Sequence, residues 1–427
     1  MREDIYWIYL QNIIGYGSRK LLKILDIFET AENFYNASYE AKVKSKLFVK
    51  SEIDKIDNYD IKSAYKVIEK CDKLGYKIIT PDNPSYPMRL KHIVNPPAVL
   101  YVQGTLPDID DEVMLAVVGT RKASDYSRAL TRELSERLTK AGAYIVSGGA
   151  LGIDTSAHTG ALAAKGNTIA VLACGLNYNY LAANEPLRMD IAANGALISE
   201  FPPDFPVYPS NFHIRNRILS GLCLGTVVIE AGRKSGALIT VDHALEQGRD
   251  IFVIPGDISS ERYVGSNRLI RDGAKIVTSP MDILEEYTHI YPHRINIAGC
   301  GEMLKGNTDE IPVSVMEYEK VDSAENKPSV KPPKKKPSHD NERQMQNNAS
   351  DNKPESFIPD KSVVNLSDDA MELYLAFSKT VMLFDELVEE SGLSVTKALA
   401  AATELEISGV AEALPGGRYQ ICKQSII

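Results

Sequence analysis

Short apolar segments alternate with amphipathic ones from residue 112 to residue 288. The apolar segments have the length of strands, and the segments between them, such as SRALTRELSERLTKAG, have the spacing of helices. Strands that are apolar on both faces need cover on both faces, which a parallel sheet between two layers of helices provides. We therefore expect a doubly wound α/β domain, with strands at EVMLAVVG, AYIVSGG, TIAVLACG, GALISEF, TVVIEAG, DIFVIPG and AKIVTS.

A helical region is expected before this sheet. Residues 1–72 read as amphipathic helices, the first two joined at Gly15-Tyr16-Gly17. The Gly-x-Gly turn fits either a SAM-like or helix-hairpin-helix-like domain that presents backbone N–H groups to DNA phosphates, or a plain helical bundle. The proline-punctuated segment from Gly75 to Gly104 predicts edge strands and argues against a helix. We assign residues 73–292 to the sheet domain.

The rest of the chain predicts a tether and a small third domain. Residues 293–362 are rich in Lys, Pro, Asn and Ser and predict a disordered linker. In residues 363–427 we expect three helices, with Ser394 as the N-cap of the third, and a hairpin that turns at residues 415–417. This order is typical of a winged helix. The third helix offers Lys397 but also Glu404, so both DNA binding and protein binding stay open for this domain.

Charge and cysteine content limit the cellular compartments and the classes of binding partner that are expected for this chain. The formal net charge is −9, so a nucleic acid would require a local basic patch. No long apolar run and no signal peptide are visible, which favours the cytoplasm. The five cysteines are scattered without a C-x-x-C pair. They predict neither a disulfide framework nor a zinc site.

Cofactor fingerprints are missing from the predicted sheet. The segment SGGALG is not a G-x-G-x-x-G fingerprint, and no G-x-x-x-x-G-K-[ST] loop occurs. We therefore expect no cofactor and no metal.

Basic residues and glycines follow several of the predicted strands. Ligands of such sheets bind beyond the carboxyl ends of the strands, where helices begin with free N–H groups. Spaced cations with an interleaved ring suit a single-stranded nucleic acid, whereas separate surface ion pairs are the alternative. The residues are Arg121, Lys122, Phe212, Arg215, Arg217, Arg233 and Lys234.

The stretch SGGALGIDTSAHTGAL, residues 147–162, fits a phosphate cradle better than a catalytic triad. On a helix that starts at Ile153, Asp154 and His158 share a face while Ser156 points away from it. A nucleophile that faces away from its base is not activated by it. Hydrolase chemistry with groups from elsewhere in the chain stays an alternative.

In series, GTRKASDYS, IVSGGALGIDTSAH, TIAVLACGL, LISEFPP, RNRILSGL, VVIEAGRKSGALITVDHALEQGRDIFVIPG and GSNRLIRDGAKIV resemble the signature of the DprA/Smf family of bacterial DNA-processing proteins. The resemblance covers roughly residues 75–288. It implies a Rossmann-like domain that binds and protects single-stranded DNA, forms a homodimer and helps to load the RecA recombinase during transformation or recombination. It implies no catalytic activity.

The family's motifs map onto three loops of this sequence. They imply DNA-binding roles for Gly119, Thr120, Arg121, Lys122, Gly148, Gly149, Phe212, Arg215, Asn216, Arg217, Lys234, Ser235 and Gly236. The chain departs from the family pattern at His213, where proline is usual, and at Tyr180-Leu181, where Tyr-Pro is usual.

Two further readings come from other classes of protein. Related folds include nucleoside-monophosphate phosphoribohydrolases, but their P-G-G-x-G-T-x-x-E loop is missing, and release of free base from AMP would test that activity. A sequence-specific repressor acting through residues 366–427 would need a more basic third helix than this one.

Overall fold

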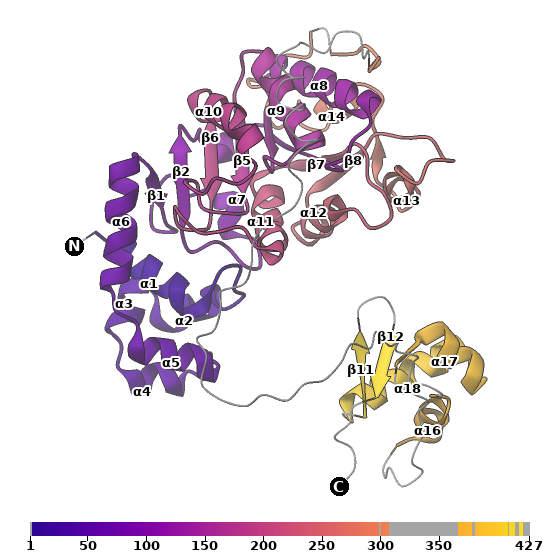
Figure 1. Cartoon of the computed structure of the whole chain (residues 1–427). Coiled ribbons are helices and arrows are strands. Elements are labelled where there is room, and N and C mark those ends of the chain that lie inside the picture. The colour runs from indigo at the N-terminus through magenta and orange to yellow at the C-terminus, as the bar shows by residue number, and fades with distance from the viewer. Residues whose placement is uncertain are drawn as a thin grey trace, which may run out of the picture. The chain divides into compact units, whose positions relative to one another are not determined.

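The computed structural model describes residues 2–298, 300–306, 366–377, 381–408, 410–414 and 418–421 (Figure 1). The chain divides into two compact units, Met1–Ser329 and Val330–Ile427, which we describe separately. Most of the predicted linker, residues 307–362, lies outside the described residues, as does the predicted hairpin turn at residues 415–417.

The elements follow one another in a mostly alternating order. The helices are α1 (Asp4–Ile14), α2 (Leu21–Phe28), α3 (Ala31–Asn36), α4 (Tyr39–Lys44), α5 (Lys50–Asn58), α6 (Lys62–Leu74), α7 (Met88–Lys91), α8 (Asp125–Lys140), α9 (Ile153–Ala163), α10 (Glu185–Ala193), α11 (Pro209–Leu222), α12 (Gly236–Glu246), α13 (Val264–Arg271), α14 (Met281–Leu284), α16 (Asp368–Leu375), α17 (Phe384–Ser391) and α18 (Val395–Ile407). The strands are β1 (Lys77–Ile79), β2 (Leu100–Gly104), β3 (Met114–Val118), β4 (Tyr144–Ser147), β5 (Thr168–Leu172), β6 (Ala196–Ser199), β7 (Gly225–Val228), β8 (Asp250–Val253), β9 (Lys275–Ile276), β10 (Val381–Leu383), β11 (Ala411–Leu414) and β12 (Arg418–Ile421).

Nine strands form one sheet in the order β1-β2-β6-β5-β4-β3-β7-β8-β9. Strands β3 to β9 are mutually parallel, and Val118 of β3 pairs with Val228 of β7. Strand β2 is antiparallel to both β6 and β1 at the edge. The predicted doubly wound, mostly parallel sheet and the predicted edge strands are confirmed.

The exclusion of a helix from the segment 75–104 was wrong in one place. Helix α7 occupies four residues, Met88–Lys91, directly after Pro87. Proline holds φ near the helical value and is tolerated where a helix begins, so it can start a short helix here as well as interrupt an extended segment.

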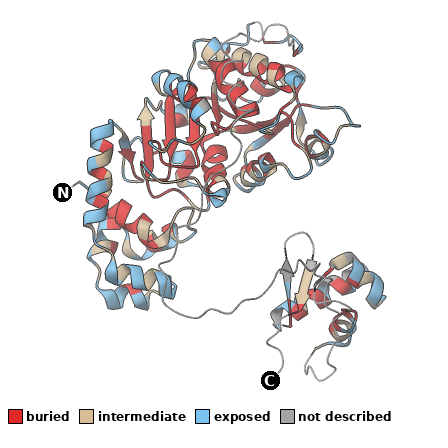
Figure 2. Ribbon diagram, in the orientation of Figure 1, coloured by how far each residue is buried: buried red, intermediate tan, exposed pale blue. Residues whose placement is uncertain are grey.

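Alternate residues of the central strands enter two separate cores. The ribbon of these strands is coloured as buried almost throughout (Figure 2). On β3, Leu115 and Val117 pack with α8, α9 and α14, while Met114, Ala116 and Val118 pack with α7, α11 and α12. Period-two alternation in which both sets are apolar is what a sheet covered on both faces requires.

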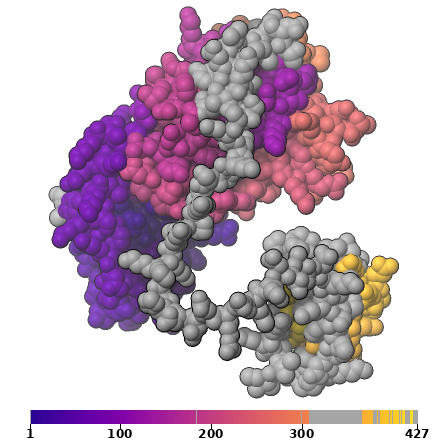
Figure 3. All heavy atoms as spheres, viewed as in Figure 1, coloured from indigo at the N-terminus to yellow at the C-terminus, as the bar shows by residue number. Residues whose placement is uncertain are grey.

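The N-terminal helices pack against the sheet near β1 and β2. In the space-filling view the indigo N-terminal residues adjoin the purple and magenta residues that follow them (Figure 3). Trp7, Leu10 and Ile13 of α1 share a core with Tyr101 of β2 and Leu197 of β6. The helical region and the sheet thus belong to one compact unit.

The glycine turn between α1 and α2 also faces into that unit. Gly15 and Gly17 both have positive φ, which favours glycine. The Gly17 N–H donates to Oε1 of Glu200 at 3.3 Å, and the Gly17 carbonyl accepts from Asn95. The Gly17 N–H is therefore used inside the protein and is not offered to a DNA phosphate.

The second unit has the order of a winged helix, α16-β10-α17-α18-β11-β12. Strand β12 pairs antiparallel with both β10 and β11. The sequence prediction of three helices and a hairpin missed β10, a strand of three residues. Ser394 stands at the N-cap of α18, although its side chain makes no capping hydrogen bond.

Candidate nucleic-acid interface

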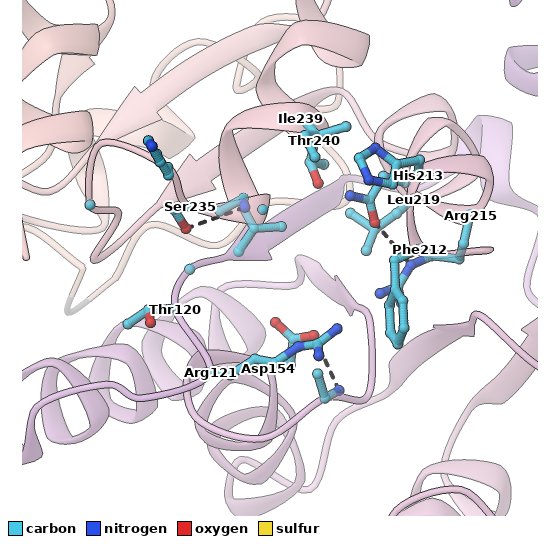
Figure 4. A pocket seen from close by; sticks show the side chains of 18 of the residues that line it. Thr120, Arg121, Asp154, Phe212, His213, Arg215, Leu219, Ser235, Ile239 and Thr240 are labelled. Carbon is cyan, nitrogen blue, oxygen red and sulfur yellow. Dashed lines mark hydrogen bonds between the residues drawn. The ribbon is translucent and has the colours of Figure 1, made fainter. Parts of the chain in front are cut away.

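The sheet changes its winding direction between β3 and β7. From β3 the chain proceeds through β4, β5 and β6 to one side, and it then returns to β7 beside β3 and continues to β8 and β9 on the other side. The loops that leave β3 and β7 therefore diverge, and this divergence creates a crevice beyond the carboxyl ends of the strands. A cavity of about 610 Å³ lies at this switch point (Figure 4).

Most of the residues assigned to DNA binding from the sequence meet in this cavity. Its lining includes Gly119, Thr120, Arg121, Phe212, Arg215, Asn216, Lys234, Ser235 and Gly236. Lys122 lies in a neighbouring cavity, and Gly148, Gly149 and Arg217 are not part of this lining. The structure thus brings together three sequence segments that are separated by up to about a hundred residues, as the topology predicted.

One wall of the cavity is the start of α12. Ser235 is the N-cap residue, and its hydroxyl accepts a hydrogen bond from the Ala237 N–H. Nothing lies within 4 Å of the place where a Cβ would stand on Gly236, so the backbone is open there. Lys234 is exposed beside this end of the helix. Free N–H groups, a helix dipole and an adjacent cation form a favourable place for an anion.

Across the cavity from Ser235, Phe212 is stacked against a cation (Figure 4). The Arg121 guanidinium carbon lies 4.3 Å from the centroid of the Phe212 ring. The Tyr180 ring meets Phe212 edge-on, with 6.0 Å between centroids. The sequence analysis placed Phe212 in a loop; it stands instead on α11, in the helix's first turn after Pro209.

Arg215 is a buried part of the cavity wall. Its Nη1 donates to the carbonyls of Gly148 and Val171, and its Nε donates to Oδ1 of Asn216. The side chain is 5% exposed, and burial lowers the pKa of the guanidinium. Arg215 therefore fixes the ends of β4 and β5 and supplies positive charge from beneath the surface.

Gly148 is explained by this arginine rather than by room for a ligand. A Cβ on Gly148 would stand 2.2 Å from Nη1 of Arg215, which is closer than non-bonded carbon and nitrogen atoms approach, so the guanidinium would have to move. Gly149 and Gly152 both have positive φ, and a Cβ on Gly152 would meet the Thr120 carbonyl at 2.5 Å. These glycines let the loop after β4 close over its neighbours. A contact of their N–H groups with phosphate stays a prediction.

Arg217 is the residue for which the structure contradicts the sequence assignment. Its side chain is 1% exposed, and it forms an ion pair with Glu200 and donates to the Asn95 carbonyl. On α11 the cavity is lined by Pro209, Phe212, His213, Arg215, Asn216 and Leu219, and Arg217 lies outside this lining. Arg217 thus joins the N-terminal helices to the sheet and does not reach the cavity.

Asp154 and His158 occupy the first turns of α9 as expected. Asp154 accepts from the Ala150 N–H and lines the cavity, and burial raises the pKa of its carboxyl although Arg215 opposes this. His158 bonds to Thr168 through Nδ1, and burial lowers the pKa of the imidazole to about 3. A neutral, buried histidine that is hydrogen-bonded to a threonine has a structural role. The sequence analysis did not identify Asp154 as a residue that lines the cavity.

Comparison with known proteins agrees with the arrangement. The family described as DNA recombination-mediator protein A matches residues 77–288, and the DprA winged helix domain matches residues 359–417. The chain is 30% identical over 422 residues to protein Smf of Synechocystis, which covers 98% of each chain. It is 38% identical over 221 residues to DNA processing protein DprA of Bacillus subtilis, covering 52% of this chain and 74% of that protein. The X-ray structure of DprA from Streptococcus pneumoniae is similar with a TM-score of 0.59 at 33% identity, covering 66% of this chain and 97% of that one.

Among the described residues, no helix is both long and apolar enough to span a bilayer.

Proposed function

This chain belongs to the DprA/Smf family of DNA-processing proteins, and on that premise we propose that it binds single-stranded DNA in the cavity at the β3–β7 switch point. The observation that carries the proposal is the Arg121–Phe212 stack, which faces the N-terminus of α12 across one cavity. A ring and a guanidinium plane accept any base, and the helix N-terminus with Lys234 accepts a phosphate.

The shape of the site favours an unpaired strand over a duplex. The cavity volume, about 610 Å³, falls within the range of pockets that enclose small ligands. A nucleotide of a flexible single strand can enter such a recess, whereas the bases of a duplex are held in their stack and must be unpaired first. The protein's overall negative charge adds nothing to this attraction, so binding depends on the local cations.

We extend the proposal on the ground of family membership. The protein would protect the bound strand and pass it to the RecA recombinase during recombination, acting in the cytoplasm as a homodimer and without a catalytic step. For the winged helix we propose no DNA contact of its own, because its exposed Lys397 is paired with Asp369 at 3.1 Å.

The test is the affinity for labelled oligothymidylate and for a blunt duplex of equal length across a salt series, measured by fluorescence anisotropy. Lys234→Ala and Arg121→Ala should each weaken binding to the single strand. Lys234→Ala should also reduce the slope of log affinity against log salt by about 0.7, the value for one lost phosphate contact. Thermal stability should stay nearly unchanged because both side chains are exposed.

Lys140→Ala is the matched control. It removes an equally exposed lysine from the last turn of α8, at the opposite edge of the sheet from the cavity. Its affinity and slope should equal those of the parent protein. Tighter binding of the duplex at every salt concentration would refute the proposed preference.

A further inference from the structure

A second cavity lies beside the first and shares Arg121 with it. Its volume is about 540 Å³, and it is lined by four cations and a tyrosine, namely Arg121, Lys122, Arg128, Arg262 and Tyr180. The cations come from three places in the chain: the loop after β3, the first turn of α8 and the loop before α13. Neither Arg262, Arg128 nor Tyr180 was assigned to DNA binding from the sequence.

Arg262, in the wall of this second cavity, is held by a buried carboxylate that accepts from several donors. Glu230, which is 1% exposed, accepts hydrogen bonds from the N–H and hydroxyl of Ser124 and from Nη1 of Arg262 at 3.0 Å. Burial raises the pKa of the Glu230 carboxyl, but these hydrogen bonds outweigh burial and hold the pKa below its ordinary value. The same Nη1 donates to the Lys122 carbonyl at 2.8 Å. Arg262 is thus fixed against the loop after β3 while its side chain stays 54% exposed.

The charge of the second cavity stays positive after its internal ion pairs are counted. Arg262 is offset by Glu230, and Arg128 lies 3.4 Å from the exposed Asp125. Arg121 and Lys122 are both exposed, and within the described residues neither has a carboxylate at ion-pair distance. An anion that enters the second cavity therefore meets two cations, Arg121 and Lys122, whose charges are not already offset by a nearby carboxylate.

Aromatic rings and Arg121 form the boundary between the two cavities. Phe212 lines the first cavity and Tyr180 the second, and the two rings are in edge-on contact. Arg121 lies on the Phe212 ring and lines both. A DNA strand with one phosphate in each cavity would cross this boundary. Its bases could stack there on the two rings and on the Arg121 guanidinium, which lines both cavities.

We propose that the second cavity is a further subsite for the same single strand, in which Lys122 and Arg262 bind the phosphates next to the nucleotide held in the first cavity. This rests on the proposed function, since the first cavity must bind DNA for the second to extend it. The subsite accounts for a group of cations that the first cavity leaves unused.

The test is a length series of oligothymidylates, from about 3 to about 15 nucleotides, with the full-length protein. The variants are Lys122→Gln with Arg262→Gln, and Lys234→Gln for the first cavity. With the shortest oligomers the double variant should bind as the parent does. With the longest it should bind about tenfold more weakly, and its salt slope should be lower by about 0.7 to 1.4, because Lys122 contributes one full phosphate contact and Glu230 offsets part of the Arg262 charge. Lys234→Gln should weaken binding at every length.

The single variant Lys122→Glu is a control for a folding defect caused by the Arg262→Gln substitution. The Lys122 side chain has no structural partner among the described residues, so its replacement should not affect folding. This variant should show the same dependence on length. If both variants bind every oligomer as the parent does, the second subsite is refuted while the proposed function stands. If they lose as much affinity for the shortest oligomer as for the longest, the two cavities are one site and the inference is wrong. A parent protein that binds no oligomer would instead refute the proposed function.

Discussion

Replacing Arg217 by alanine should destabilise the N-terminal unit and leave DNA binding almost intact. The Arg217–Glu200 pair is buried on both sides, with side chains 1% and 3% exposed. It also connects separate parts of the chain, because Glu200 accepts from the Gly17 N–H and Arg217 donates to the Asn95 carbonyl. Removal of Arg217 leaves a carboxylate without its cation in a dry environment.

The expected loss follows from that burial. Breaking a buried ion pair by removing one partner costs about 3–5 kcal/mol, since the remaining charge stays desolvated. Burial already raises the pKa of Glu200, and Arg217 opposes this rise. Without Arg217 the pKa should rise further, so the loss should shrink toward acid pH. In the double variant Arg217→Met with Glu200→Gln no charge remains and the Gly17 N–H keeps an acceptor, so most of the stability should return.

Urea unfolding followed by tryptophan fluorescence measures the effect, because the chain has a single tryptophan and Trp7 is buried in α1. The free energy of unfolding should fall by about 3–5 kcal/mol for Arg217→Ala and recover in the double variant. Affinity for single-stranded DNA below the unfolding range should stay within about threefold of the parent value. A variant of normal stability that binds DNA more than tenfold more weakly would refute the reasoning and make Arg217 a DNA contact.

Four other perturbations give separate tests. Phe212→Leu removes the ring under Arg121 and should weaken single-strand binding about tenfold in anisotropy titrations, whereas Phe212→Trp should preserve it. Gly148→Ala should lower the free energy of unfolding in urea by about 1–3 kcal/mol, since its Cβ would collide with the Arg215 guanidinium. With its pKa lowered to about 3, His158 binds fewer protons in the folded than in the unfolded state, so its contribution is complete above pH 6.5 and falls by about 2 kcal/mol at pH 5. The drop in unfolding free energy between pH 7 and pH 5 should therefore be smaller by that amount in His158→Gln. A chain ending at residue 306, without the winged helix, should keep its single-strand affinity within about tenfold.

The strand pattern was predictable because burial on both faces leaves a strong mark in the sequence. Every strand from β3 to β9 corresponds to an apolar segment, and the loops with Arg121 and Lys234 follow β3 and β7, which the winding places side by side. That winding rule rests on the chemistry of parallel strands and needs no knowledge of side-chain contacts.

The sequence pattern did not distinguish Arg217, which lies outside the cavity, from Arg215, which lines it. In the segment RNR both arginines look alike, and the segment was taken as a loop. A helix from Pro209 would have separated them, because Arg215 shares a face with Phe212 and Leu219, whereas Arg217 lies farther round the helix, beyond His213 at the edge of the lining. Proline at the first helical position was the available signal.

Arg262 and β10 had no comparable local signal. Arg262 reaches the second cavity only because the loop before α13 folds over the loop after β3, a long-range contact. Strand β10 is three residues long and pairs with β12, so its conformation is set by its neighbour rather than by its own sequence.

Photo-crosslinking of the protein to a single strand that carries bromouracil, followed by mass spectrometry of the linked peptides, locates the bound DNA on the protein. The linked residues should fall in the segments 119–122, 209–216 and 232–240, around the cavity at the switch point, and Lys234→Ala should reduce their yield. Crosslinks confined to residues 366–421, with none in those three segments, would contradict DNA binding at this cavity.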